Sequence, residues 1–386
     1  MKLLLEIVFW FFTLLFLANY FVYPAIVIAV SKFLRPGPPR TDTNAAGPRK
    51  VSLIIAAYNE EKVIEAKLRN SLELDYPRDR FEIIVVSDGS DDKTHEIAAG
   101  FHDRGVVALH DDKRNGKSAA LNRGAAVSSG EILVFSDANN DFERDAIHHL
   151  VKHFDDPQTG AVTGAKHVYA RDDLQATQGD GLYWRYESGI KLAESDIGSI
   201  TSGDGEIFAI RKRLFEPIEP HIINDDAALT FSIVKQGYRV LYEPAAKSYE
   251  NASKDLVDDF HVKVRMSAGG YQTIRENFAY LFPPGNLFAF QFILHKVLRW
   301  LCPVFLALIF LSSALLAGQA FYRIVFLLQV VFYAVSIVGW LNRSKPDLSS
   351  FLYIPMYFSV MNLALLFGLF RHLGGRQNVQ WRKAAR

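Results

Sequence analysis

The sequence predicts an α/β domain with a Rossmann-like, mostly parallel sheet, flanked by transmembrane helices. Three short runs of apolar and β-branched residues, at 51–57, 81–86 and 131–135, have the length and composition of buried parallel strands. Each run ends in a cluster of acids and amides, and each cluster is followed by a helical pattern. Ligands of open α/β sheets bind beyond the carboxyl ends of the strands, so we expect these clusters to share one edge.

Composition limits what else the chain can hold. Its 386 residues, 49% of them hydrophobic, leave room for one sizeable domain and several membrane helices. The formal net charge of +1 gives no electrostatic reason to expect nucleic acid as a partner. The single cysteine, Cys302, excludes an intrachain disulfide and a cysteine-based metal site.

Four apolar segments are candidates for membrane spans. Residues 3–30 contain one charge, Glu6, and are long enough to cross a hydrocarbon layer of about 30 Å, so we expect residues 1–33 to be a retained anchor. Three more candidates, at 298–316, 324–340 and 351–370, lie within an expected C-terminal membrane region at 298–371.

Basic residues beside these segments predict the orientation. They follow the anchor and flank the first C-terminal candidate: Lys32, Arg35, Arg40, Lys296 and Arg299. By the positive-inside rule the domain between them is cytoplasmic, which we take to mean an integral protein of a bacterial inner membrane. Three further crossings would send the C-terminus outside, yet the tail at 372–386 is basic. Either one of the three segments is re-entrant or interfacial, or the tail tolerates the violation.

After a Pro- and Gly-rich linker at 34–50, we expect one domain at 51–276, in which strands and helices alternate. The expected order is strand 51–57, helix 61–72, strand 81–86, helix 93–99, strand 106–110, helix 117–127, strand 131–135, helix 144–154 and strand 161–168. This alternation is typical of right-handed β–α–β units. A less regular part follows, with helix 174–192, a glycine-rich turn at 202–206, strand 207–210, helix 225–235 and an interfacial amphipathic segment at 277–297.

Asp137-Ala138-Asn139 gives the sharpest indication of chemistry. An acid at the end of a buried strand, with a second oxygen ligand two residues later, can hold Mg²⁺ or Mn²⁺ against a pyrophosphate. The alternative is that Asp137 and Asn139 are ordinary turn residues. Asp88, at the next strand end, is equally open: it can accept hydrogen bonds from a uracil N–H or a ribose hydroxyl, while Asp91 or Asp92 caps the following helix.

Two further motifs each leave one candidate. The stretch at 115–118 resembles a phosphate-binding P-loop, but Asp111 stands where that motif needs glycine, so only Lys117 remains a candidate for contact with a phosphate. Asp225 and Asp226 begin a helix, where acids in the first turn favour the helix dipole. Alternatively, one of them is a metal-free carboxylate that removes a proton from an acceptor hydroxyl.

Taken in order, these segments resemble the membrane-bound family 2 inverting glycosyltransferases of the polysaccharide-synthase branch, which have the GT-A fold. The resemblance covers about residues 50–275. It rests on Ala57-Tyr58-Asn59-Glu60-Glu61, on Ser87-Asp88-Gly89-Ser90 with Asp92, on Asn115-Gly116-Lys117-Ser118-Ala119-Ala120-Leu121-Asn122, on Asp137-Ala138-Asn139, and on Asn224-Asp225-Asp226 with Leu229.

The resemblance implies a role for each matching position. Asp226 would be the catalytic base, and Asp137 with Asn139 would hold the metal. The donor would be bound by Ala57, Tyr58, Asn59, Glu60, Asp88, Lys117, Asp137 and Arg265, and the acceptor side would include Gly203, Asp204, Glu206, Trp184 and Asp225. Asn139 stands where the family usually has Asp, which leaves metal coordination to Asp137 and water. The Gln and Trp of the Gln-x-x-Arg-Trp motif are replaced by Val262 and Met266, which argues against long-chain processive synthesis.

The implied reaction is a metal-dependent, inverting transfer from a nucleotide-sugar, with UDP the favoured nucleotide, to a hydroxyl of a glycan or lipid-linked acceptor at the bilayer. Two alternatives stay open. One is an enzyme that glycosylates a polyprenyl phosphate, and the other is a non-catalytic membrane subunit.

Overall fold

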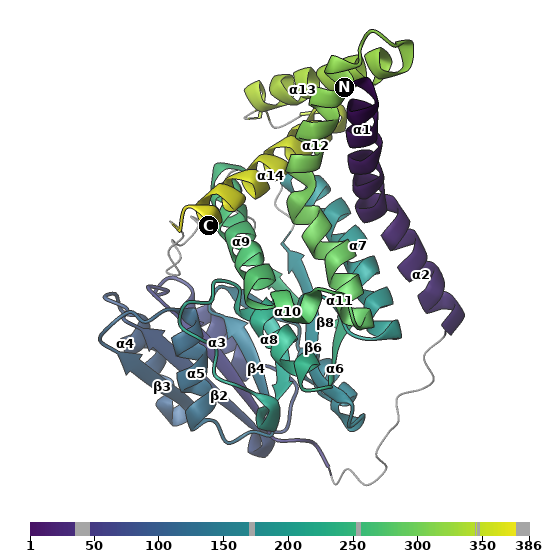
Figure 1. Cartoon of the computed structure of the whole chain (residues 1–386). Helices are drawn as coiled ribbons and strands as arrows, with labels where there is room; N and C mark the ends of the chain where they lie inside the picture. The colour runs from purple at the N-terminus through teal and green to yellow at the C-terminus, as the bar shows by residue number, and fades with distance from the viewer. Residues whose placement is uncertain (35–46, 170–173, 252–255, 344, 346–347, 376–386) are drawn as a thin grey trace.

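A mixed eight-stranded sheet forms the centre of the soluble part, in the order β3-β2-β1-β4-β7-β6-β8-β5 (Figure 1). The computed structural model describes residues 1–34, 47–169, 174–251, 256–343, 345 and 348–375, without the side chains of 174–184. The strands are β1 Val51–Ala57, β2 Phe81–Asp88, β3 Val106–Asp111, β4 Ile132–Asp137, β5 Asn140–Phe142, β6 Thr159–Val168, β7 Ile207–Arg211 and β8 Arg239–Glu250. Of these, β5 and β7 run against the other six.

Strand register brings the predicted clusters to one edge. All seven residues of β1 are buried, as expected for a central parallel strand. In its parallel pairings Ala57 lies opposite Ser87, and Ala56 lies opposite Asp137. Asp88 lies opposite Asp111 on β3. The segments that follow β1, β2, β3 and β4 therefore leave the sheet side by side.

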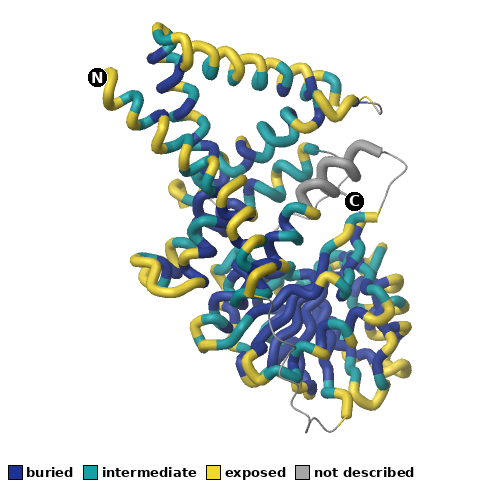
Figure 2. The backbone as a smooth tube through the Cα atoms, turned by 90° about the vertical axis from the view of Figure 1, so that its right-hand side faces the viewer, coloured by how far each residue is buried: buried dark blue, intermediate teal, exposed yellow. Residues whose placement is uncertain are grey.

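Apolar side chains cover both faces of the sheet. Leu53 and Ile55 point into one core with Leu68, whereas Ile54 packs with Leu121 on the other face. Figure 2 shows the strands as the buried centre of the soluble part. The surrounding helices are α3 Ile64–Leu72, α4 Thr94–Ala99, α5 Lys117–Val127, α6 Ala146–Val151, α7 Leu174–Ile197, α8 Asp225–Lys235 and α9 Leu256–Glu276.

Among the described residues, four continuous helical segments, here called rods, are long and apolar enough to cross a membrane. They are Lys2–Leu34, Leu287–Leu315, Ala320–Leu341 and Ser350–Leu373. The first comprises α1 Lys2–Leu17, a π-helical turn η1 Ala18–Val22 and α2 Tyr23–Leu34. The second comprises α11 Leu287–Phe292, a π-helical turn η6 Ile293–Val297 and α12 Leu298–Leu315. The last two are α13 and α14, and the short helix α10 Phe278–Leu281 precedes α11.

The two described ends of the chain lie on opposite sides of the helical region (Figure 1). Near the N-terminus, Trp10 Nε1 donates to the hydroxyl of Tyr322 on α13 at 3.2 Å. At the other end, α14 packs along α9, where Ser267 Oγ donates to the Leu365 carbonyl at 3.2 Å. The end of α14 is thus beside the soluble part. Most of the predicted basic tail, from residue 376, lies outside the described residues.

The structure differs from the sequence expectation at several elements; β5 and α9, for example, were not predicted. The strand β8 was not anticipated, because Pro244 and several charged residues interrupt its apolar pattern; register shifts in its pairing with β6 accommodate the irregularity. The segment expected at 277–297 does not end before the first C-terminal span. Instead, its second half is continuous with that helix from Leu287 onward, because the π-helical turn bridges the two parts.

Candidate active site

The turn after β1 is tied to the loop after β2. Asn59 has a left-handed backbone conformation with a φ of 53°, which Asn tolerates better than most residues. Its side chain donates to Asp91 Oδ1 at 2.6 Å and accepts from the Asp91 N–H at 3.1 Å. The Glu60 N–H donates to Thr94 Oγ1 at 2.7 Å. Asn59 and the Glu60 backbone thus shape this edge of the sheet, and their contact with a nucleotide stays a prediction.

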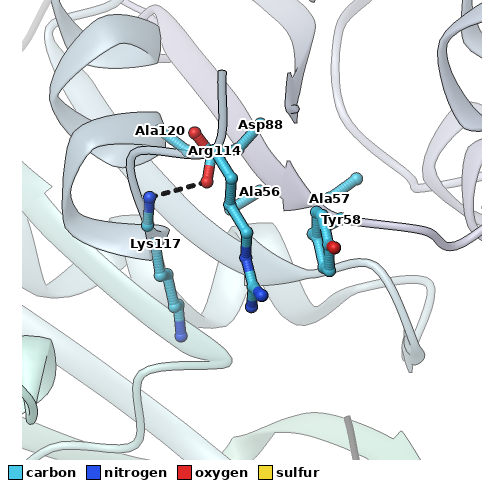
Figure 3. Close-up of a pocket in the computed structure, with 8 residues that line it drawn as sticks. Ala56, Ala57, Tyr58, Asp88, Arg114, Lys117 and Ala120 are labelled. Atoms are coloured by element: carbon cyan, nitrogen blue, oxygen red, sulfur yellow. Dashed lines mark hydrogen bonds between the residues drawn. The ribbon is translucent and has the colours of Figure 1, made fainter. Parts of the chain in front are cut away.

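Asp88 and Asp92, at the end of β2 and in the loop after it, make different hydrogen bonds. Asp92 Oδ1 accepts the Thr94 N–H at 2.9 Å, at the start of α4, as capping predicts for one of these acids. Asp88, which is 5% exposed, accepts the Asn115 N–H at 2.8 Å and the Gly116 N–H at 2.7 Å. The second of these bonds is the dashed line in Figure 3. Asp88 therefore fixes the start of α5.

A small pocket opens beside Asp88 (Figure 3). Its lining comprises Ala56, Ala57, Tyr58, Asp88, Arg114, Gly116, Lys117 and Ala120. The Arg114 guanidinium lies 3.8 Å from the centre of the Tyr58 ring, a cation–π arrangement. The pocket thus combines flat stacking surfaces, a carboxylate and two cations, which are groups suited to a nucleoside diphosphate. Sequence reasoning missed Arg114, although its position two residues before Gly116 was the available signal.

Lys117 bridges two acids from distant parts of the sequence. Its Nζ lies 2.8 Å from Asp137 Oδ1 and 3.2 Å from Asp225 Oδ2. Burial disfavours the charged form of Lys117, but attraction to Asp137 and Asp225 outweighs it and raises the pKa of the ammonium. A fixed positive charge therefore lies between the end of β4 and the start of α8.

Asp226 follows directly in the first turn of α8. Burial, reinforced by the negative charge of Asp225, raises its pKa to about 6. A carboxylate with a pKa near neutral can accept a proton during a reaction and is ionised at physiological pH. Asp226 thus has the electrostatic properties of a general base.

The turn at 201–206 closes over these acids. A Cβ added at Gly205 would lie 3.4 Å from both Asp225 Oδ2 and Asp226 Cβ, and 3.5 Å from Lys117 Nζ. The Gly205 carbonyl accepts from Lys117 Nζ at 3.4 Å, so the turn contacts the lysine that bridges Asp137 and Asp225. Next to it, Asp204 Oδ2 lies 2.8 Å from Lys191 Nζ of α7.

Two predicted acceptor-side residues have other surroundings. The Glu206 carboxylate is buried, 2.8 Å from Lys166 Nζ, and its Oε1 accepts from Ser248 Oγ at 3.2 Å. Burial raises its pKa to about 7. Gly203 packs against the Phe208 ring, which a Cβ would approach to 2.5 Å. Both residues contact the protein interior, so their acceptor-side roles stay predictions.

Helix α9 packs against the start of α8 and contributes a second basic residue to the site. Asn224 Nδ2 donates to the Met266 carbonyl at 3.0 Å, which joins α9 to the start of α8. The half-buried Arg265 has its pKa lowered by burial, against the attraction of Asp225, Asp137 and Asp226. It is the second cation within electrostatic reach of the three acids.

The oxygen ligands at this edge fit a hard divalent cation only if the substrate completes its coordination. The Asp137 side chain is 36% exposed, so it is open to an incoming ligand, and Asn139 follows it in the turn. Within the described part of the chain, no group of three or more His, Cys, Asp or Glu side chains is arranged to hold a metal. Mg²⁺ is commonly bound by one or two carboxylates together with substrate phosphates and water, which matches this site.

The structure therefore brings Lys117, Asp137, Asp225, Asp226 and Arg265 together, next to the pocket lined by Tyr58 and Asp88. Trp184 lies on α7, in the part whose side chains are outside the described residues. Sequence reasoning also missed Lys191, whose importance depends on a fold contact with Asp204 that no motif indicates.

Comparisons with known proteins agree with this geometry. A family model described as Glycosyl transferase family 2 matches residues 52–218. The probable glycosyltransferase YdaM of Bacillus subtilis (strain 168) is 27% identical over 372 residues, which is 87% of each chain. The poly-beta-1,6-N-acetyl-D-glucosamine synthase of Staphylococcus aureus (strain COL) is 27% identical over 244 residues, covering 62% of this chain and 59% of that one.

Among solved structures, the mannosyltransferase PcManGT from Pyrobaculum calidifontis, in complex with GDP-Man and Mn2+, has a TM-score of 0.72 at 23% identity. The match covers 96% of this chain and 99% of that chain. This likeness confirms the predicted α/β fold.

Proposed function

We propose that this protein, a glycosyltransferase with a family 2 domain at residues 52–218, transfers a sugar from a nucleoside-diphosphate donor to an acceptor hydroxyl, with inversion. We further propose that it acts at the membrane, because four described helices are long and apolar enough to cross one. The relatives' names set aside the non-catalytic alternative.

One observation carries the proposal: the bridge from Asp137 through Lys117 to Asp225, with Asp226 next in the chain. It places a donor-side acid, a cation and a base candidate within one group. The nucleotide would occupy the pocket at Tyr58 and Arg114, with its diphosphate directed toward Lys117. The sugar would then lie between Asp137 and Asp226, which is where an acceptor must reach it.

The chain's own residues account for the proton and the charge. Asp226 takes the proton of the acceptor hydroxyl as its oxygen forms a bond to the anomeric carbon. The bond from that carbon to the diphosphate oxygen breaks in the same step, so the configuration inverts. Lys117 and Arg265 offset the negative charge that accumulates on the departing diphosphate.

Asp137, with Asn139 as a weaker second ligand, would hold Mg²⁺ or Mn²⁺. The cation supplies charge neutralisation of the diphosphate. The neighbour PcManGT was solved with Mn2+ and GDP-Man, so we include both this metal and this donor in the test below. UDP remains the nucleotide that we favour.

The test is nucleotide release from a panel of UDP-sugars and GDP-mannose in detergent, with Mn²⁺ or Mg²⁺. We expect release from at least one donor, and a loss of about 100-fold in Asp137→Ala. Asp79→Ala, which changes an acid whose side chain is 80% exposed, is the matched control and should keep full activity. No release from any donor would contradict the proposal.

The acceptor class is tested separately with Asp226→Asn. A hydroxyl acceptor needs a base, so sugar transfer should fall by about 100-fold or more while donor binding is unchanged. An anionic polyprenyl phosphate acceptor needs no strong base. A near-normal rate in Asp226→Asn would therefore support that alternative.

A further inference from the structure

The turn at 201–206 contacts Lys117 through the Gly205 carbonyl and lies next to Asp225 and Asp226. Buried charged groups on its opposite side hold it in place. At its start, the Thr201 N–H and hydroxyl donate to Glu194 Oε2 at 3.0 and 3.1 Å. At its centre, Asp204 pairs with Lys191. Glu194 and Lys191 are 0% and 4% exposed, and both lie on α7. The position of the turn is therefore set by α7.

A membrane helix contacts the same two residues, Glu194 and Thr201. His295 lies in the π-helical turn η6 and is 0% exposed. Its Nδ1 lies 2.8 Å from Glu194 Oε1 and 3.0 Å from Thr201 Oγ1. The widened turn matters because π-helical turns are rare and occur frequently at functional sites. The first C-terminal rod, Leu287–Leu315, thus contacts the first residue of the turn directly.

The N-terminal rod supports this contact. Asn19, in the π-helical turn η1, donates through Nδ2 to the carbonyls of Leu294 at 2.6 Å and His295 at 3.1 Å. The hydroxyl of Tyr23 donates to Glu194 Oε1 at 2.6 Å. Two helices far apart in sequence therefore meet at their π-helical turns. Both contact Glu194 or His295, which hold Thr201 at the start of the turn at 201–206; we call this turn the acceptor-side turn.

A second carboxylate binds the same membrane helix to α7. Glu187, which is 3% exposed, lies 3.3 Å from His295 Nε2 and 2.5 Å from Arg299 Nη1, and it also pairs with Lys296. These ion pairs are buried, so breaking one would leave an uncompensated charge inside the protein. Glu187 thus joins α7 to the membrane helix through three basic side chains.

We propose that His295 and Glu194, together with Lys191, are positioning residues through which the membrane helices set the acceptor-side turn. This inference rests on the proposed function. These residues would align the acceptor with Asp226. They would take no part in binding the nucleotide, because the proposed nucleotide pocket lies on the other side of Lys117. Loss of the contact therefore uncouples donor cleavage from transfer, because water replaces the misaligned acceptor.

The experiment measures nucleoside diphosphate released per sugar incorporated into membrane material, using native membranes and a radiolabelled donor identified by the panel. Thr201→Val removes only the hydroxyl that contacts His295 and Glu194, and His295→Gln removes the imidazole. We expect the ratio to rise about fivefold or more in both, since small misalignments of reacting groups have large effects. Asn19→Ala should also raise this ratio, because it removes the hydrogen bonds that hold the backbone at His295.

Two variants serve as controls. Thr201→Ser keeps the hydroxyl and should restore the wild-type ratio. Ser359→Ala removes a hydrogen bond of 3.0 Å between the hydroxyls of Ser336 and Ser359, on α13 and α14, and should leave the ratio unchanged. A variant that is merely less stable loses release and incorporation in proportion, so its ratio does not move.

The outcomes separate the two proposals. A wild-type protein that transfers sugar, with ratios in Thr201→Val and His295→Gln equal to wild type, would overturn the positioning role alone. A wild-type protein that incorporates no sugar from any donor would overturn the proposed function and this inference with it.

Discussion

At the scale of single residues, Asp226 connects the fold to a measurable pH dependence. Its pKa is raised from 3.8 to about 6, and a base acts only when ionised. We therefore expect the transfer rate at limiting substrate to be half-maximal near pH 6 and to fall about tenfold per pH unit below it. A rate that is flat between pH 5 and pH 7 would show that Asp226 does not act as the base.

Lys67 makes an independent prediction about stability. It is 1% exposed, donates to Asn140 Oδ1 at 3.0 Å, and has its pKa lowered from 10.5 to about 7 by burial. Between pH 7 and pH 9 the unfolded chain keeps this proton while the folded protein loses it, so stability rises with pH. We expect the wild type to gain about 2 kcal/mol relative to Lys67→Met over that interval.

The comparison is a pair of thermal melts in detergent at the two pH values, with Lys67→Met removing the titrating amine. Other groups titrate equally in both proteins, so only the difference between the two shifts is used. Equal shifts would mean that Lys67 keeps its proton in the folded protein.

Sequence alone could predict Asp137 and Asp88 because a parallel register places consecutive strand ends side by side. It could also predict Lys117 and Asp226 as candidates, since each begins a helix. It did not predict that Lys117 bridges Asp137 and Asp225. That contact joins three segments through the fold, and neither periodicity nor a local motif contains this information.

At the scale of elements, prediction succeeded where the local pattern was strong. The strand at 51–57 and the helices at 117–127 and 225–235 were predicted with the bounds that the structure has. Prediction failed for β8, which depends on pairing with β6 and tolerates an interrupted pattern. The start of the second membrane rod was also missed, because a π-helical turn keeps the chain helical where sequence indicated a boundary.

The packing of α9 on α8 gives a prediction at this scale. A Cβ at Gly269 would lie 2.4 Å from Asn224 Oδ1, at the start of α8. Gly269→Ala must therefore displace the Asn224 side chain and break its hydrogen bond to the Met266 carbonyl, which joins α9 to the residue directly before Asp225 and Asp226. Because a shift of about 1 Å can cost on the order of 100-fold in rate, we expect transfer to fall at least tenfold.

Nucleotide binding should survive this substitution, since α9 does not line the pocket at Tyr58. Gly318→Ala is the matched control, because nothing lies within 4 Å of a Cβ there. Full activity in Gly269→Ala, or an equal loss in Gly318→Ala, would contradict the argument that α9 sets the position of Asp226.

At the scale of the whole molecule, the arrangement of helices bears on which side of the membrane the C-terminus lies, a question that the charge pattern of the sequence left open. The start of α13 lies beside the N-terminal rod, far from the soluble part, and α14 returns along α9 (Figure 1). The rings of His372 and Tyr271 are 6.2 Å apart. The described end of α14 therefore lies beside the soluble part. An interfacial position of α13 would satisfy the positive-inside rule.

We therefore predict that the N-terminus is external and that the C-terminal end of α14 is cytoplasmic, as is the soluble part. The measurement is labelling of intact cells with a membrane-impermeant maleimide, using Lys2→Cys, Asp79→Cys and Gly374→Cys; the native Cys302 is 1% exposed and gives little background. Lys2→Cys should react in intact cells, whereas Asp79→Cys and Gly374→Cys should react only after lysis. Reaction of Gly374→Cys in intact cells would mean that all three C-terminal helices cross the bilayer. The packing of α14 on α9 would then be impossible in the membrane, because the two helices would end on opposite sides.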